Sequence, residues 1–175
     1  MRNTRNNPLE DLGMHLPLIC DRYEIRDDGP PGAGKFRGGA GVIKSQRYLT
    51  PGFMTHESDR HLDAPWGAFG GKAGSVGKME IYNVKDPSNV RQEYSKFSGL
   101  RTNEGDVVSY ISPSGGGFGD PLERDPLKVL DDVLDEIITI EAARDDYGVV
   151  MDEVDDGYGW SVNSDATKKL RAEMS

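Results

Sequence analysis

Alternation of apolar and polar residues marks several short strands in the first two thirds of the chain. In residues 22–26, Tyr23 and Ile25 point to one side of an extended chain and the charged residues between them point to the other. Residues 79–82 repeat this period of two. We therefore predict strands over residues 22–26, 42–49, 78–84 and 107–112, separated by turns rich in glycine and proline.

The period changes to 3.6 after Asp125. Apolar residues from Leu127 to Ile138 fall on one stripe, opposite a row of acidic residues that includes Asp132. Asp125 suits the N-cap and Pro126 the first helical position. The pattern predicts an amphipathic helix that covers an apolar surface.

Two further helices are predicted towards the C-terminus. The first starts at a Thr139 cap, runs to Tyr147 and stops at Gly148, which suits the left-handed position after a helix end. The second covers residues 165–173. Between them, the acidic residues 152–159 are predicted to form a solvated loop. The chain is thus expected to be α+β: a glycine-rich, mainly antiparallel β body over residues 1–119, followed by a short acidic helical appendage over residues 120–175.

Composition supports a folded chain that relies on a partner. The chain has 175 residues and only 35% hydrophobic residues, but its aromatic side chains provide surface for packing. The net charge of -9 resides in the helical region, because residues 120–175 hold 16 acidic and 6 basic side chains. This balance argues against nucleic acid or an anionic membrane as a partner. No apolar run approaches the roughly 20 residues of a membrane-spanning helix, and we expect a cytoplasmic location.

Several local features resemble chemical motifs. Residues 29–35 match the start of a phosphate-binding loop, but Phe36 stands where Ser or Thr would bind Mg²⁺, and two prolines remove backbone donors. Nucleotide binding there is not expected. Cys20 is the only cysteine, which excludes an internal disulfide, and we interpret it as a small packed hydrophobe.

A run of glycines joins the β body to the helical region. Gly115, Gly116 and Gly117 are consecutive, and prolines flank the run. A flexible linker would contain more serine and would lack Phe118, so the pattern favours an ordered loop that approaches a neighbouring backbone closely. A passive hinge is the alternative.

Residues 56–63 hold the densest cluster of potential metal ligands and acid–base groups. In an extended strand Asp59 and His61 share a face and could hold a divalent ion, whereas ion pairing between Asp59 and Arg60 or nearby groups is the simpler interpretation. Trp66 follows, as a core anchor or as the wall of an interface, with the core favoured.

These segments together resemble one family, the hydantoinase B/oxoprolinase family, which includes the acetone carboxylase alpha subunit. The resemblance follows the chain in order and ends in a segment similar to the family's closing segment. It rests on residues 3–10, 22–26, 34–41, 58–60, 65–67, 115–121 and 141–150.

The resemblance covers the C-terminal third of the usual B-type polypeptide, and it implies a function within a complex. A separately encoded or truncated piece of this kind is expected to complete a domain begun by another chain. Expected partners are a larger A-type subunit with an actin-like ATPase fold and a B-type subunit. ATP with Mg²⁺ and a divalent metal are expected in those partners, with none bound by this chain. The substrate is expected to be a small molecule.

The resemblance leaves several functions open. The complex is expected to be an ATP-dependent cyclic amide hydrolase or a ketone carboxylase, in which this chain contributes structure and pocket walls. The alternatives are an assembly subunit with no active-site role, or an independent metal-dependent enzyme that uses His56, Asp59 and His61. Catalytic residues are not assigned. The residues expected at a substrate pocket or interface are Asp59, Arg60, Trp66, Gly115, Gly116, Gly117 and Asp120.

Overall fold

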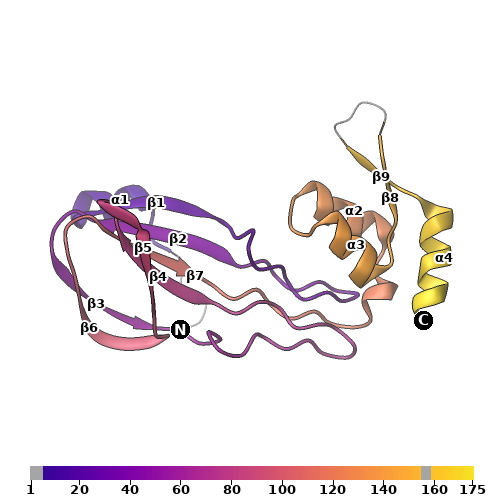
Figure 1. Cartoon of the computed structure of the whole chain (residues 1–175), viewed down its shortest axis with the longest axis horizontal. Helices are drawn as coiled ribbons and strands as arrows, with labels where there is room; N and C mark the ends of the chain where they lie inside the picture. Colours follow the sequence, from indigo (N-terminus) through magenta and orange to yellow (C-terminus); the bar gives the residue numbers. More distant parts are fainter. Residues whose placement is uncertain (1–5, 155–158) are drawn as a thin grey trace. The chain divides into compact units, whose positions relative to one another are not determined.

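The computed structural model describes residues 6–154 and 159–175. Its contacts divide the chain into two compact units (Figure 1). Unit 1 comprises Met1–Ile25, Val42–His61 and Gly77–Ser112, and unit 2 comprises Arg26–Gly41, Leu62–Val76 and Pro113–Ser175. Each unit is therefore assembled from three separate stretches of sequence.

Unit 1 is built on antiparallel strands. Five of them form one sheet in the order β1-β2-β7-β4-β5, and β3 pairs with β6. The helix α1 (Leu9–His15) precedes β1. The strands are β1 (Leu18–Ile25), β2 (Val42–Tyr48), β3 (Gly52–Glu57), β4 (Lys78–Asn83), β5 (Asp86–Glu93), β6 (Lys96–Thr102) and β7 (Asp106–Ile111).

A small apolar cluster forms the core of unit 1. The β4 residues Met79 and Ile81 are 1% and 3% exposed, and they pack with Val108 of β7 and Met54 of β3. The alternation in residues 79–82 thus reflects a strand with one buried face. Aromatic and leucine side chains surround this cluster: Tyr48, Phe97, Leu100 and Tyr110.

All four predicted strands are confirmed, as β1, β2, β4 and β7. Three further strands of unit 1, β3, β5 and β6, and the helix α1 were not predicted. Strand β5 is exposed along nearly its whole length, pairs with β4 alone and contains Pro87. Since neither of its faces is buried, it has no apolar period for a sequence pattern to reveal.

Unit 2 begins with three glycine-rich extended stretches, 26–41, 62–76 and 113–119, which lie mostly outside regular strands. Their backbones hydrogen-bond to one another. Gly32 N donates to Gly115 O at 2.9 Å and Lys72 N donates to Ala33 O at 2.7 Å. Gly117 N donates to Lys72 O at 2.9 Å, which links the third stretch to the second. The stretches therefore satisfy their backbone groups without forming a continuous sheet.

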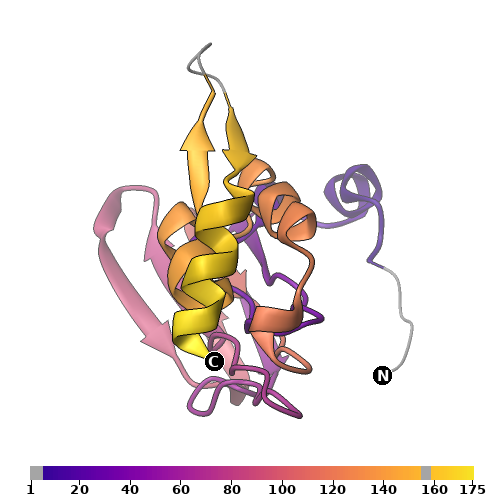
Figure 2. The ribbon, with the colours of Figure 1, turned by 90° about the vertical axis from the view of Figure 1, so that its right-hand side faces the viewer.

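The helices of unit 2 follow the third glycine-rich stretch. They are α2 (Pro126–Leu134), α3 (Ile140–Tyr147) and α4 (Ser164–Met174), with the short 3₁₀ helix η1 (Pro121–Glu123) before them. Strands β8 (Met151–Glu153) and β9 (Trp160–Val162) form a hairpin that leads into α4 (Figure 2). Together with the sheets of unit 1, these helices confirm the predicted α+β class.

The predicted start of α2 and both predicted ends of α3 are confirmed by their caps. The Asp125 carboxylate accepts a hydrogen bond from Leu127 N at 3.0 Å, and the Thr139 hydroxyl accepts one from Ala142 N at 3.1 Å. Gly148 ends α3 with a left-handed φ of 61°. These local signals are strong because each supplies a partner or a conformation that a helix terminus requires.

The apolar stripe predicted for the first of these helices is wrong in part. Leu127 and Leu134 are 63% and 50% exposed, whereas Val129 and Val133 are buried. The buried face also contains Asp132, which the pattern placed on the solvent side and which is only 4% exposed. Arg37 and Arg124 compensate the charge of Asp132, so the buried face is rotated relative to the hydrophobic pattern.

The helix is also shorter than its apolar pattern. It ends at Leu134, because Glu136 adopts a left-handed φ of 56° that a continuing helix excludes. Ile137 and Ile138 then pack from the connection against the cluster that contains Val129, Ala143 and Tyr147. They contribute to the core of unit 2 without being helical.

The acidic segment 152–159 is only in part the solvated loop that was predicted. Asp152 and Glu153 belong to β8, where they pair with Ser161 and Trp160. Residues 155–158 of this segment, and residues 3–5 of the family-like N-terminal motif, lie outside the described residues. Among the described residues, no helix is long and apolar enough to cross a membrane.

Candidate functional site

The residues predicted for a pocket or interface fall in different units. Asp59 and Arg60 belong to unit 1, whereas Trp66, Gly115–Gly117 and Asp120 belong to unit 2. Unit 2 brings Trp66 and the glycine run together, since a Cβ atom at Gly116 would lie 2.0 Å from the Trp66 carbonyl oxygen. Asp120 caps η1 by accepting a hydrogen bond from Leu122 N at 2.9 Å.

Close backbone approach explains the glycine run. A Cβ atom at Gly117 would lie 2.0 Å from Ala33 O, and one at Gly38 would lie 2.0 Å from Gly115 O. Since these neighbours are backbone atoms, they have no side-chain freedom with which to make room. Residues 115–117 are therefore a site of tight packing between stretches that are far apart in the sequence.

Trp66 is not a core residue, contrary to the favoured interpretation. Its side chain is 70% exposed, while its carbonyl oxygen lies against Gly116. The backbone of this residue is packed, and the indole faces outward. The alternative interpretation of Trp66, as the wall of an interface, stays a prediction.

Three exposed phenylalanines that the sequence did not single out as a group meet in unit 2. The ring of Phe118 lies 5.0 Å from that of Phe69 and 6.3 Å from that of Phe36, measured between centroids. Backbone bridges join Phe36 and Ala68 to Phe118. The three rings are 48–83% exposed, with Phe69 the most exposed. We call Phe36, Phe69 and Phe118 the phenylalanine cluster.

Phe69 also has an unusual backbone. Its φ of 52° lies in the left-handed region, which a bulky aromatic residue rarely adopts. A strained residue that also exposes a large apolar ring is a typical feature of a functional surface. No sequence pattern indicates the phenylalanine cluster, because each of the three glycine-rich stretches contributes one of its rings.

Asp59 makes an exposed ion pair in unit 1. Its Oδ1 lies 2.8 Å from Lys96 Nζ, and the hydrogen bond from Lys96 lowers the pKa of the Asp59 carboxyl below its usual value. Arg60 adds a smaller electrostatic effect in the same direction and adopts a left-handed φ of 65°. Surface pairs of this kind contribute little stability.

Two histidines of the cluster at residues 56–63 meet at one hydroxyl group. The Nε2 atoms of His56 and His61 lie 2.9 and 2.8 Å from Ser58 Oγ. Burial lowers the pKa of both imidazoles. Among the described residues, no group of three or more histidine, cysteine, aspartate or glutamate side chains is arranged to hold a metal ion. Asp59, which was considered together with these histidines, is paired with Lys96.

A buried ion-pair network lies in unit 2 and was missed by the sequence analysis. Asp132 Oδ1 accepts from Arg37 Nε at 2.9 Å, and its Oδ2 accepts from Arg124 Nη2 at 2.8 Å. Arg171 donates to the carbonyl oxygens of Tyr147 and Arg124, which ties α4 to this network. We interpret the pairing of Asp132 with Arg37 and Arg124 as structural, because it links distant parts of unit 2.

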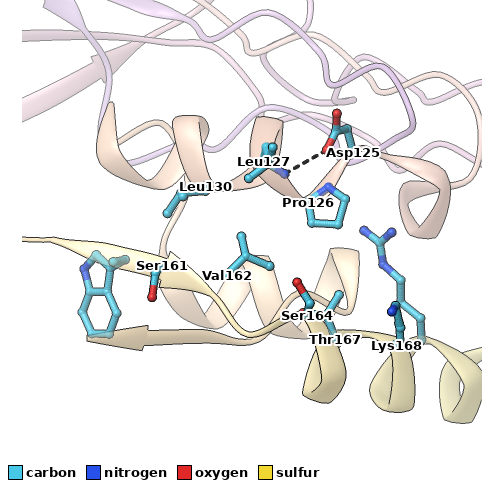
Figure 3. Close-up of a pocket in the computed structure, with 11 residues that line it drawn as sticks. Asp125, Pro126, Leu127, Leu130, Ser161, Val162, Ser164, Thr167 and Lys168 are labelled. Atoms are coloured by element: carbon cyan, nitrogen blue, oxygen red, sulfur yellow. Dashed lines mark hydrogen bonds between the residues drawn. The ribbon is translucent and has the colours of Figure 1, made fainter. Parts of the chain in front are cut away.

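A groove of about 480 Å³ opens between α2, β9 and α4. Figure 3 shows Leu127 and Leu130 of α2 on one side and Val162 and Thr167 on the other. Lys168 lies at one end of the groove. Its volume falls in the range of small-molecule pockets, and its lining is mainly apolar.

The residues that resemble a phosphate-binding loop do not fit a nucleotide. Lys35 pairs with Glu123 at 2.9 Å, and a Cβ atom at Gly32 or Gly34 would meet backbone atoms at 2.2 and 2.6 Å. Since neighbouring chain occupies the space beside these glycines, the loop packs against protein instead of forming a phosphate cradle.

Comparison with known proteins defines the class. The family model described as hydantoinase B/oxoprolinase matches residues 1–121, and the chain belongs to this family. It is 41% identical over 170 residues to a Pseudomonas sp. (strain NS671) protein named as the candidate B-type subunit of a D-/L-hydantoinase. It is 32% identical over 149 residues to the beta subunit of the Pseudomonas jessenii caprolactamase.

Two solved structures have the same fold. The crystal structure of the ATP-dependent caprolactamase from Pseudomonas jessenii matches 95% of this chain with a TM-score of 0.77 and 29% identity. A nucleotide-free acetone carboxylase structure matches 96% of the chain with a TM-score of 0.74 and 22% identity, which shows likeness of fold alone.

The matched proteins are much longer than this chain. The chain spans 27% of the hydantoinase subunit, 25% of the caprolactamase subunit and 28% of the caprolactamase structure. The family is thus shown, while the activity of a whole complex extends beyond the residues present in this sequence.

Proposed function

We propose that this chain is a small subunit or C-terminal fragment of an ATP-dependent cyclic amide hydrolase of the hydantoinase/oxoprolinase type. The observation that carries the proposal is the 41% identity to a hydantoinase-type subunit over 97% of the chain. Both hydantoin and caprolactam are cyclic amides, and the similarity to acetone carboxylase is lower, at 22% identity. Ketone carboxylation is therefore the second candidate.

The proposed complex divides its chemistry among subunits. The chain contributes structure and pocket walls, whereas ATP with Mg²⁺ and the catalytic divalent metal are held by the larger partners, an A-type subunit of actin-like ATPase fold and a B-type subunit. The packed, phosphate-excluding loop at Lys35 supports placing ATP elsewhere.

A small-molecule substrate and a supply of ATP favour a cytoplasmic location. The acidic character of residues 120–175 argues against nucleic acid and membrane surfaces as partners.

Native mass spectrometry of the chain purified from its own cells through a small affinity tag tests the proposal. We expect two larger subunits to be recovered with it, and we expect the recovered complex to hydrolyse ATP faster when hydantoins or lactams are added. Stimulation by ketone with bicarbonate would instead support a carboxylase. Recovery of a folded, monomeric 19.2 kDa chain alone would contradict the proposal.

The tight packing of the glycine stretches favours a second candidate role, in assembly alone. Gly116 cannot separate the two roles, because any side chain there would collide with the Trp66 carbonyl. Phe69 is better suited, since its exposed ring can be removed without a cavity, and asparagine tolerates its left-handed backbone. Phe69→Asn is matched by Tyr94→Asn, because both rings are 83% exposed.

The two roles predict different results for Phe69→Asn. A complete but inactive complex would place the phenylalanine cluster beside the active site, whereas loss of the partners would identify it as an assembly surface. We expect Tyr94→Asn to retain both assembly and activity. An identical loss in both variants would show that the effect is not specific to the cluster.

A further inference from the structure

Two imidazole nitrogens in unit 1 are directed at a single point. His56 Nε2 and His61 Nε2 both lie within hydrogen-bond distance of Ser58 Oγ, at 2.9 and 2.8 Å. A serine hydroxyl has one proton to donate, so it can serve only one of the two nitrogens as a donor. The Ser58 hydroxyl also lies 3.3 Å from the Ser95 carbonyl oxygen, to which it can donate instead. At least one of the two rings therefore carries its proton on Nε2 and donates to the hydroxyl oxygen. The two rings thus share one hydroxyl group as a hydrogen-bond partner.

The backbone is shaped to hold the two rings in this position. Strand β3 ends at Glu57, and Ser58 N donates to Ser95 O at 2.8 Å. The left-handed φ of 65° at Arg60 then reverses the chain and returns His61 towards His56, with 6.3 Å between the ring centroids. A non-glycine residue in this conformation is strained. Strained residues are common at binding sites.

The His56 ring is held from its other sides as well. It packs against Phe97 at 5.8 Å and Tyr110 at 5.4 Å between centroids. The turn itself is anchored by the hydrogen bond from Gly77 N to Arg60 O at 2.8 Å. The two nitrogens are therefore preorganised by the sheet and by the turn, which reduces the entropy lost when a ligand binds them.

We propose that His56 and His61 form a binding site for a divalent transition metal ion such as Zn²⁺ or Ni²⁺. Neutral imidazole is a preferred ligand of these ions, whereas Mg²⁺ and Ca²⁺ prefer oxygen. The Ser58 hydroxyl and water complete the coordination. The site has two protein nitrogens and open positions, so it binds more weakly than a structural zinc centre with four protein ligands. It differs from the expectation that this chain holds no metal, and it does not depend on the proposed complex.

Nuclear magnetic resonance of the untagged full chain tests this site directly, because the chain contains only three histidines. Long-range ¹H–¹⁵N spectra resolve each imidazole during a titration with ZnCl₂. We expect the signals of His56 and His61 to shift together and to saturate at one equivalent. His15, on α1, is the internal control and is expected to respond only at much higher zinc concentration.

Variants identify the ligands by isothermal titration calorimetry. His56→Ala and His61→Ala are each expected to weaken zinc binding at least about tenfold, because each leaves one nitrogen of two. His15→Ala and Cys20→Ser are the controls and should leave the affinity unchanged. Circular dichroism confirms that each variant is folded. The proposal is overturned if only one of the two histidines shifts, if His15 responds equally, or if the single variants bind zinc as the parent chain does.

Discussion

The two units satisfy their backbone hydrogen bonds in different ways. Unit 1 does so with antiparallel strands that carry ordinary side chains, in a sheet ordered β1-β2-β7-β4-β5. Unit 2 brings extended stretches so close together that a Cβ atom at Gly116 or Gly117 would lie 2.0 Å from a carbonyl oxygen. Strands tolerate many residues at each position, whereas close backbone approach tolerates only glycine.

The units also differ in where they keep charge. In unit 1, Asp59 pairs with Lys96 at the surface, where their side chains are 79% and 55% exposed. In unit 2, the Asp132 side chain is 6% exposed and binds two arginines. The same residue type therefore has a negligible role in one unit and a structural role in the other. Variants at four places in the chain test these differences.

The largest effect is expected for Asp132→Ala. Removing this carboxylate leaves Arg124, itself 9% exposed, without its buried partner. We expect the free energy of unfolding to fall by about 3–5 kcal/mol, the cost of breaking a buried ion pair on one side. Urea denaturation measures it. Asp59→Ala is the matched control, for which no measurable change is expected. Equal losses in both variants would refute the contrast between the units.

Gly116→Ala is expected to destabilise the chain by about 2–3 kcal/mol, because its Cβ atom would collide with the Trp66 carbonyl. Gly39→Ala is the control in the same unit, since a Cβ atom added there would have nothing within 4 Å and the φ of Gly39 is not left-handed. We expect a change below about 1 kcal/mol there. Thermal melting of the two variants measures the difference. Equal destabilisation of both variants would show that glycine is needed for its backbone flexibility and not for close packing.

Tyr147 makes the stability of unit 2 sensitive to alkaline pH. Burial is the main cause that raises its pKa to about 12, and within the described residues its hydroxyl has no hydrogen-bond partner. A raised pKa means that the folded state favours the neutral phenol. The stability that this provides is complete below about pH 10 and is lost as pH rises towards 12.

Tyr147→Phe isolates this effect from that of other tyrosines. Between about pH 9 and 11.5, we expect the free energy of unfolding of the parent chain to fall by roughly 2 kcal/mol more than that of the variant. Near pH 8 the two should be similarly stable, since phenylalanine fills the same space. Parallel pH profiles would contradict a buried, neutral Tyr147.

The smallest effect concerns a buried neutral pair in unit 1. Ser45 Oγ and Ser109 Oγ lie 2.8 Å apart on neighbouring strands. Either Ser→Ala change leaves one hydroxyl without this partner and should cost about 1 kcal/mol. The double variant should cost less than the sum of the two single variants, because no hydroxyl is then left unsatisfied. Strict additivity in urea denaturation would show that the hydrogen bond contributes nothing.

Sequence patterns predicted those elements that are determined by interactions between neighbouring residues. The four predicted strands, the Asp125 and Thr139 caps and the Gly148 terminus are all confirmed. The glycine run was expected to approach a neighbouring backbone closely, and it does so, although Trp66 beside it proved exposed. Each of these signals depends on residues close together in the sequence.

Other features required contacts that sequence patterns do not contain. The burial of Asp132 depends on Arg37, which lies 95 residues away, and the phenylalanine cluster unites three separate stretches. The left-handed turn that joins the two histidines could not be predicted, because Arg60 and not a glycine adopts this conformation. A hydrophobic period reports which residues prefer burial, but not which distant partner makes the burial of a charge favourable.

The residues alone thus determined the α+β class, the start of α2, both ends of α3 and membership in the hydantoinase B/oxoprolinase family. Only the tertiary structure decided which glycines are required, which carboxylate is buried and which histidines meet. The physical reason is that capping and periodicity are properties of neighbouring residues. Close backbone approach, charge burial and convergence of side chains are instead created when separate stretches of the chain come together.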